Sequence, residues 1–304
     1  MGGNSLIDPA SDRGNLDTHD LARAVCEEIA TLAVEAGSVV VTHGNGPQVG
    51  FEMLRNETAS ALIPPDGMDV NVAATQGYIG YLIQQVLGDV LEERGLDIPV
   101  SSVITQIQVD PRDPGFSSPT KPVGPFYDAG EARRMMSDGW RMCEDAGRGW
   151  RRVVASPKPL KILELPVIRA LVEAGQIVIC AGGGGVPVVR EGLRVRGVPA
   201  VIDKDHATAL LAGSLGADTF IISTGVPEVY LHYGKPDQRT LRRARLAEML
   251  EYLEQGHFAS GSMRPKILAS ASFLENGGAR VVITSPGLIL SALAGEAGTT
   301  ILAR

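Results

Sequence analysis

Short runs of β-branched residues alternate with longer amphipathic stretches along most of the 304-residue chain. Six runs have the length and composition of strands, at residues 38–42, 100–109, 176–180, 219–223, 229–232 and 279–284. Six stretches have helical spacing, at residues 18–36, 72–94, 160–174, 205–213, 244–255 and 265–276. The alternation predicts an α/β fold, a three-layer αβα sandwich with an open, mainly parallel sheet. Ligands of such folds bind beyond the carboxyl ends of the strands.

One segment interrupts this alternation. Residues 110–159 are rich in Pro, Gly, Arg and aromatic residues, hold both tryptophans and show no clear periodicity. A segment of this length is too long for an ordinary loop. We therefore expect a single domain over residues 1–304, with a small protruding lid subdomain at about 111–158.

Composition narrows the possible partners. The net charge of −7 and the pI near 5.3 argue against a general nucleic-acid surface, because binding to the phosphate backbone needs clustered positive charge. No apolar run approaches the roughly 20 residues that span a bilayer. The three cysteines are scattered and lack the spacing of a metal site. We expect small-molecule substrates, no nucleic-acid or membrane partner, no protein-held metal and a cytoplasmic location.

Two glycine-rich stretches directly follow predicted strands. Gly44-Asn45-Gly46 follows the strand at 38–42, and four successive glycines from Gly182 follow the strand at 176–180. Glycines let backbone N–H groups approach an anion closely, and a helix N-terminus adds favourable partial charge. A tight turn needs only one glycine, so four favour backbone packed against a ligand. Neither stretch matches the P-loop or the dinucleotide-binding fingerprint.

Lysine is rare in this chain, with only six lysines among 28 basic residues. A lysine in a Gly- or Pro-rich motif therefore indicates that a compact ammonium group is required. Asp203, Lys204 and Asp205 lie between a short apolar run and a helix, where a solvated turn with a capping Asp is the simpler interpretation. Lys266 is expected in the first turn of a helix, and Lys121 in the lid. Three lysines at one site, with Asp205 orienting them, suit phosphoryl transfer.

Other catalytic signatures are missing from the sequence. There is no serine nucleophile elbow, no H-E-x-x-H motif and no Cys/His cluster. Among the histidines we expect structural roles for His206, His232 and His257, whereas His43 borders the first glycine stretch.

A resemblance to a known family rests on eight segments: VVVTHGNGPQVG, TQGYIGYLIQQ, SSPTKPVGPF, EDAGRGWRRVVASPKP, GGGGVPVV, AVIDKDHATALLA, YGKPDQRTL and GHFASGSMRPK. In this order they resemble the carbamate kinases of the amino acid kinase superfamily, over essentially the whole chain. The resemblance implies a mainly parallel eight-stranded sheet, a lid over the active site and a homodimer. It also implies a phosphotransferase with a carboxyl-group acceptor, which interconverts carbamoyl phosphate plus ADP and carbamate plus ATP with Mg²⁺.

The resemblance also assigns residues by motif match. Four residues would contact the transferring phosphoryl group or organise those that do: Lys121, Lys204, Asp205 and Lys266. The phosphate and carbamate positions would be lined by Gly2, Gly3, Asn4, Gly44, Asn45, Gly46, Gly182, Gly183 and Gly184. The nucleotide would be bordered by Asp203, Ser223, Thr224, Gly225, Val226, Val229, Tyr230, Lys235 and Met263.

The chain departs from the family pattern at two places. Pro227 replaces an acidic residue near the nucleotide and removes a backbone donor, so nucleotide affinity or preference could change. Family members begin with a short apolar strand that leads into the turn at Gly2-Gly3-Asn4, whereas only Met1 precedes that turn here. The first strand is thus expected to be missing, which would leave neighbouring backbone groups unpaired in the centre of the sheet.

Two alternatives to a carbamate kinase stay open. A kinase of the same fold could act on another small carboxylate or carbamate-like acceptor, because members share the phosphate machinery and differ in the acceptor pocket. A non-catalytic nucleotide-binding homologue would fit a chain without its first strand. The retained lysines favour an enzyme. The sequence does not distinguish arginine metabolism from other carbamoyl phosphate pathways.

Overall fold

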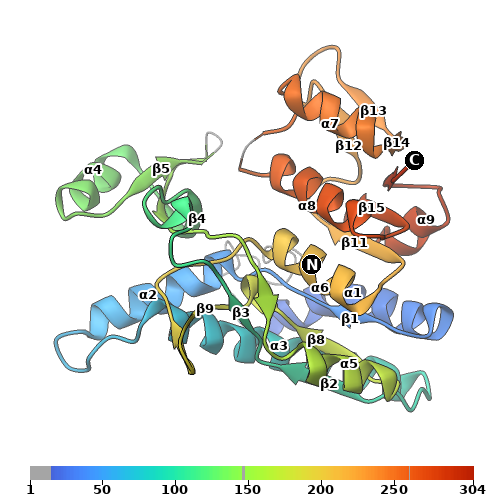
Figure 1. The fold of residues 1–304 in the computed structure, drawn as a ribbon, viewed down its shortest axis with the longest axis horizontal. Coiled ribbons are helices and arrows are strands. Elements are labelled where there is room, and N and C mark those ends of the chain that lie inside the picture. The colour runs from blue at the N-terminus through green and yellow to red at the C-terminus, as the bar shows by residue number, and fades with distance from the viewer. Residues whose placement is uncertain (1–14, 146–147, 260) are drawn as a thin grey trace.

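The computed structural model describes residues 15–145, 148–259 and 261–304 (Figure 1). Its N-terminal part is built on three parallel strands in the order β1–β8–β2, namely β1 (Val40–Val41), β8 (Ile177–Cys180) and β2 (Val100–Val103). Alternate residues of β8 point to opposite faces. Ile177 and Ile179 pack with α1 (Asn15–Ala36) and α3 (Met68–Glu93), and Val178 and Cys180 pack with α5 (Leu165–Glu173) and α6 (Lys204–Leu215). Helices therefore cover both faces of this sheet.

The C-terminal part has a second sheet, in the order β11–β15–β16–β14. Its strands are β11 (Thr219–Ser223), β15 (Arg280–Thr284), β16 (Thr299–Leu302) and β14 (Arg243–Arg245). The elements around it are the hairpin of β12 (Val229–Leu231) and β13 (Arg239–Leu241), with α7 (Leu246–Glu254), α8 (Met263–Glu275) and α9 (Ile289–Leu293). The Glu28 carboxylate of α1 accepts hydrogen bonds from the N–H groups of Gly287 and Ile289, so the first helix holds the start of α9.

The chain also forms a mixed sheet and a small antiparallel sheet. The mixed sheet has the order β10–β9–β3–β7, with β10 (Arg194–Gly197), β9 (Val186–Glu191), β3 (Gln106–Gln108) and β7 (Lys161–Ile162). The antiparallel sheet has the order β4–β6–β5, with β4 (Lys121–Tyr127), β6 (Trp150–Val154) and β5 (Met142–Glu144), and it carries α4 (Ala129–Ser137). The antiparallel sheet together with α4, called the lid below, projects away from the rest of the described chain, called the body, in Figure 1. Its elements span residues 121–154, within the range of about 111–158 predicted for a lid subdomain.

The structure confirms the predicted α/β class and moves several element boundaries. The strand predicted at 219–223 is found at those residues. The helices predicted at 160–174 and 244–255 begin later, because their first residues pair as β7 and β14. The helix α2 (Gly46–Ala59) and the hairpin β9–β10 are two elements that are not among the helices and strands predicted from the sequence. Four helices, α1, α3, α5 and α8, end one or two residues before a glycine with a positive φ angle, namely Gly37, Gly95, Gly175 and Gly277.

The strand predicted at 100–109 is divided at Thr105, because the N–H of this residue donates to the Gln76 side chain instead of to a neighbouring strand. Its N–H and C=O pair with the Gln76 side-chain amide, and its hydroxyl accepts the N–H of Ala181. The two halves, β2 and β3, consequently enter different sheets.

The single eight-stranded sheet implied by the resemblance is also not what the described residues show. Strands β1 and β11 each lie at the edge of their own sheet, and no described strand joins them. Within these two sheets only the β15–β16 pair is antiparallel. The turn expected at Gly2, Gly3 and Asn4 lies outside the described residues. Among the helices that the structure describes, none combines the length and apolar character of a membrane span.

Candidate active site

The start of α6 holds the charged residues predicted from the sequence. Asp203 is the N-cap, and its Oδ1 atom accepts the N–H of Asp205 at 2.9 Å. The capping interpretation is therefore correct for Asp203. The Asp205 carboxylate instead binds two ammonium groups, Lys204 Nζ at 2.6 Å and Lys266 Nζ at 2.8 Å. Lys266 comes from the first turns of α8, which packs against α6.

Burial and charge oppose each other at Asp205, which is only 4% exposed. Burial alone would raise the pKa of the Asp205 carboxyl, but the ammonium groups of Lys204 and Lys266 hold that pKa well below its usual range. Burial lowers the pKa of Lys266, although Asp205 opposes this change. The three groups form a buried triad in which one ionised carboxylate fixes two lysine side chains.

The lid supplies the third predicted lysine. Lys121 is the first residue of β4, and its Nζ atom lies 2.6 Å from Oδ2 of Asp203. Burial raises the pKa of the Asp203 carboxyl, but the Lys121 ammonium outweighs burial and lowers that pKa overall. Lys121, Lys204 and Lys266 therefore all bind carboxylates of the same helix turn.

The two glycine stretches contact each other beside this turn. A Cβ atom on Gly182 would lie 2.3 Å from the His43 ring, and one on Gly183 would lie 2.2 Å from the Asn45 amide. A Cβ atom on Gly184 would lie 2.2 Å from the carbonyl oxygen of Ile202, directly before Asp203. Only glycine permits these approaches, so the four-glycine run joins the first stretch to the start of α6.

The backbone donors of the second stretch are largely used within the protein. The N–H of Gly183 donates to the carbonyl of His43, and the N–H of Gly184 donates to that of Ala181. The first turn of α2, which begins at Gly46 after the N-cap Asn45, has N–H groups without intrahelical acceptors. The α2 N-terminus is therefore the better candidate for anion binding by backbone groups. Phosphate contacts by Gly44, Asn45, Gly46 and Gly182 to Gly184 remain predictions.

His43 is a buried neutral ring that packs against Gly182. Its Nδ1 atom lies 3.2 Å from the carbonyl oxygen of Gly44. Burial lowers the pKa of His43 from 6.5 to about 4, with the nearby Lys204 ammonium contributing in the same direction. His43 is thus placed to support the glycine stretch rather than to carry charge.

Lowering the pH from 7 to 4.5 should destabilise the protein through His43. The unfolded imidazole binds a proton below pH 6.5 whereas the folded one stays neutral until about 4, so stability falls as pH falls through this window. The loss should approach roughly 3 kcal/mol at the lower end. Urea unfolding of wild type and His43→Gln at pH 7 and 4.5 measures it. An equally steep loss in both proteins would rule out His43 as the cause.

The residues predicted to border the nucleotide follow the carboxyl end of β11. Ser223 ends this strand, and the N–H of Thr224 donates to the carbonyl of Thr284 at the end of β15. Gly225 and Pro227 are exposed, and Val226 and Tyr230 are partly buried. Val229 is fully buried, and its N–H donates to the Thr299 hydroxyl, so its side chain serves the core. Lys235 is exposed beyond β12, and Met263 begins α8 three residues before Lys266.

The structure adds Gln48 and Thr284 to the candidate site residues predicted from the sequence. Gln48, in the first turn of α2, is 4% exposed, yet neither polar atom of its amide has a partner among the described residues. The hydroxyls of Ser223 and Thr284, paired residues of β11 and β15, are likewise buried without a partner in that part of the chain. Buried polar groups are normally paired, so these groups are candidates for ligand contact. The only sequence signal was their position, directly after a glycine stretch or at a strand end.

Comparison with known proteins identifies the family. A model described as the amino acid kinase family matches residues 1–285. Carbamate kinase from Pyrococcus horikoshii is 46% identical over 308 residues, covering 99% of this chain and 97% of the relative. The carbamate kinase-like protein YahI of Escherichia coli strain K12 is 46% identical over 307 residues, with the same coverage. The chain belongs to the amino acid kinase family.

Within this family the similarity is to carbamate kinases. The solved structure of carbamate kinase from Giardia lamblia bound to AMP-PNP has a TM-score of 0.88 and 41% identity, and the match covers 99% of this chain and 96% of that one. The resemblance inferred from the eight sequence segments is therefore confirmed.

Proposed function

We propose that this chain is a carbamate kinase that transfers a phosphoryl group reversibly between carbamoyl phosphate plus ADP and carbamate plus ATP. One observation carries the proposal: Lys121, Lys204 and Lys266 converge on a single helix turn beside two contacting glycine stretches. The similarity to carbamate kinases along nearly the whole chain supports the choice of acceptor.

The arrangement of lysines suits the chemistry of phosphoryl transfer. The transferred group carries negative charge on its equatorial oxygens, and catalysis consists mainly of positioning and charge stabilisation. Asp205 holds the ammonium groups of Lys204 and Lys266 in place before substrate arrives. Lys121 can exchange its partner Asp203 for a phosphoryl oxygen, because both side chains are only partly buried. The three lysines then neutralise the transferring group from two sides, the body and the lid.

Mg²⁺ is proposed to enter with the nucleotide. Both carboxylates of the site already hold ammonium groups at 2.6 to 2.8 Å. Among the described residues there is no group of three or more His, Cys, Asp or Glu side chains that could hold a metal ion. This donor set fits a cation bound mainly by nucleotide phosphates and water, where it supplies further charge neutralisation.

We also propose a cytoplasmic homodimer. Exposed apolar side chains occur on α3 and on the β9–β10 hairpin, among them Val70, Tyr81 and Leu193, of which Leu193 is 98% exposed. These elements adjoin, because a Cβ atom on Gly197 of β10 would touch the Asp69 carboxylate of α3. Exposed large apolar side chains on adjoining elements are typical of an interface. The mass of the purified chain by light scattering tests this assembly.

A coupled assay tests the proposed reaction. Purified chain is given carbamoyl phosphate, ADP and Mg²⁺, and ATP formation is followed. We expect turnover that depends on all three components. Turnover with another acyl phosphate but not with carbamoyl phosphate would favour a kinase for a different carboxylate. Nucleotide binding without any turnover would favour the non-catalytic homologue.

Replacing Gln48 by leucine should separate activity from stability. If the buried amide serves the acceptor, Gln48→Leu raises the KM for carbamoyl phosphate about tenfold or more, the effect of losing one to two hydrogen bonds to the substrate. Unfolding stability should stay equal or rise, because an unpaired buried amide is itself destabilising. Steady-state kinetics and urea unfolding measure the two effects.

Gln76 offers a matched control for Gln48. It is equally buried, but its amide is paired with the backbone of Thr105 through both polar atoms. Gln76→Leu should therefore lower stability by about 1 to 3 kcal/mol. A loss of stability in Gln48→Leu similar to that in Gln76→Leu would show that the Gln48 amide is needed by the fold rather than by the substrate.

A further inference from the structure

The lid rests on α2 through a contact between two glycines. A Cβ atom on Gly50 of α2 would lie 2.0 Å from Cα of Gly124 in β4, so helix and strand meet backbone to backbone. Gly124 has a φ angle of +76°, which glycine adopts without strain. Lys121 lies three residues earlier in the same strand. Any change in how β4 sits on α2 therefore moves the lid lysine.

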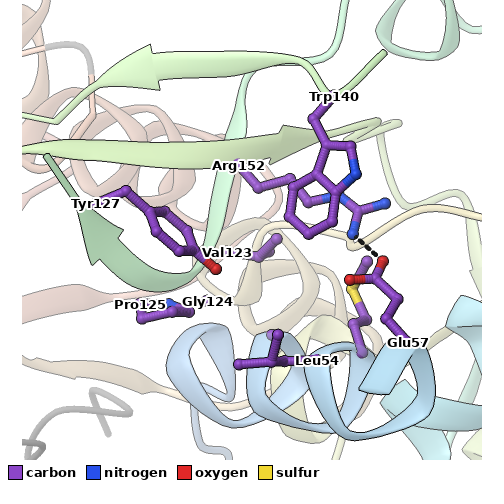
Figure 2. Close-up of a pocket in the computed structure, with 10 residues that line it drawn as sticks. Leu54, Glu57, Val123, Gly124, Pro125, Tyr127, Trp140 and Arg152 are labelled. Carbon is purple, nitrogen blue, oxygen red and sulfur yellow. Dashed lines mark hydrogen bonds and ion pairs between the residues drawn. The ribbon is translucent and has the colours of Figure 1, made fainter. Parts of the chain in front are cut away.

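A charged cluster joins the same two elements nearby (Figure 2). Nη1 of Arg152 in β6 donates to Oε1 of Glu57 in α2 at 2.6 Å. The Arg152 guanidinium also lies 4.0 Å from the centroid of the Trp140 ring, within the range of a cation–π contact. Figure 2 shows Trp140 and Arg152 on the lid side and Glu57 on the helix below them. The Glu57–Arg152 pair thus crosses from the body to the lid.

Arg152 is also directly coupled to the strand that carries the catalytic lysine. Strands β4 and β6 are antiparallel, with Arg152 opposite Val123 and Val154 opposite Lys121. Arg152 is therefore about 7 Å along the ladder from the level of Lys121, two residues away. Because the ladder is continuous there, a shift of Arg152 relative to Glu57 would also shift Lys121.

We propose that Glu57 and Arg152 are positioning residues that dock the lid on α2 and so place the Lys121 ammonium at the start of α6. The proposal rests on the proposed catalytic role of Lys121. The Gly50–Gly124 contact fixes the separation of lid and body, and the ion pair fixes the rotation of the lid about that contact. Trp140 holds the guanidinium plane toward Glu57.

The expected losses of catalytic rate and of stability distinguish a positioning role of the Glu57–Arg152 pair from a purely structural one. A partly exposed ion pair contributes little to the stability of a fold, and both side chains here are partly exposed. A displacement of about 1 Å in a group that acts on the substrate can lower the rate about 100-fold. Loss of the pair should therefore change catalysis much more than thermal unfolding.

The lid provides a matched control within itself. Arg151 Nη1 and Asp145 Oδ2 form an ion pair at 3.2 Å, and the Arg151 guanidinium lies 5.1 Å from the Phe126 centroid. This pair has the same chemistry as Glu57–Arg152, but both partners belong to the lid. Asp145→Asn removes one carboxylate charge, as Glu57→Gln does, without breaking a contact to the body.

The test is a double-mutant cycle with carbamoyl phosphate, ADP and Mg²⁺. We expect Glu57→Gln to lower kcat about 10- to 100-fold with a melting temperature near that of wild type, and Asp145→Asn to keep wild-type kcat. In a Lys121→Ala background, Glu57→Gln should have no further effect, because it acts through that lysine. Equal losses of kcat from Glu57→Gln in both backgrounds would overturn the proposal.

The cycle also separates this proposal from the function on which it rests. Wild-type turnover in Lys121→Ala would remove the proposed role of the lysine itself. Impaired turnover in Lys121→Ala together with wild-type turnover in Glu57→Gln would refute only the positioning role. A large drop in melting temperature in Glu57→Gln, with kcat unchanged in the folded fraction, would likewise refute it and show a structural ion pair.

Discussion

Lys204→Ala should lower the turnover of carbamoyl phosphate and ADP by about 100- to 1000-fold, the loss typical of removing one preorganised group that stabilises transition-state charge. Lys204 is suited to this role because Asp205 holds its ammonium group at 2.6 Å, at the start of α6 and next to the four-glycine run. The ammonium stabilises charge that develops on the transferring group, so kcat should change more than KM. Steady-state ATP formation by the purified variant measures the effect.

Lys161 offers a control for the loss of a lysine. It is an exposed residue of β7, and Lys161→Ala should retain wild-type turnover. Circular dichroism of both variants shows whether the fold is kept. Wild-type turnover in a folded Lys204→Ala variant would remove this lysine from its proposed role.

Asp205→Asn should destabilise the protein by about 3 to 5 kcal/mol at pH 7, the range found when one partner of a buried ion pair is removed. The substitution leaves the ammonium groups of Lys204 and Lys266 together without the carboxylate between them. Urea unfolding measures the loss. Asp110→Asn is a suitable comparison, because Asp110 pairs with Arg112 on the surface, and that change should leave the stability nearly unchanged.

The pH dependence of the same variant gives a second measure. The pKa of Asp205 is lowered by folding, so its contribution is complete above about pH 4 and is lost only at lower pH. Wild type should therefore lose its advantage over Asp205→Asn below pH 4, a window distinct from that of His43. A constant difference between the two proteins from pH 7 to pH 3 would contradict the assigned ionisation.

The fold class was predictable because it depends on local periodicity. The strands β8 and β11 are short β-branched runs that follow the helices α5 and α6, and the structure has them at almost the predicted residues. The division of the run at 100–109 was not predictable. It depends on Gln76, which is distant in sequence and captures the backbone of Thr105. Periodicity carries no information about such a contact.

The candidate site was predictable where rare residues occur in motifs. Lysine is uncommon in this chain, so Lys121, Lys204 and Lys266 stood out, and the structure brings them to one helix turn. Gln48 and Glu57 carry no such signal. Their significance arises from what surrounds them after folding, an unpaired amide in one case and a lid arginine in the other.

Asp203, Lys204 and Asp205 are consecutive residues at the start of α6, so the rotation of this helix about its axis determines the directions of all three side chains together. Successive helical residues point about 100° apart around the axis. One residue inserted between Asp203 and Lys204 would turn the side chains of Lys204 and Asp205 away from Lys266. It would also turn them away from Asp203, which binds Lys121. The exposed β9–β10 hairpin can accept an inserted residue at Gly192. The same insertion at the start of α6 would disrupt the site.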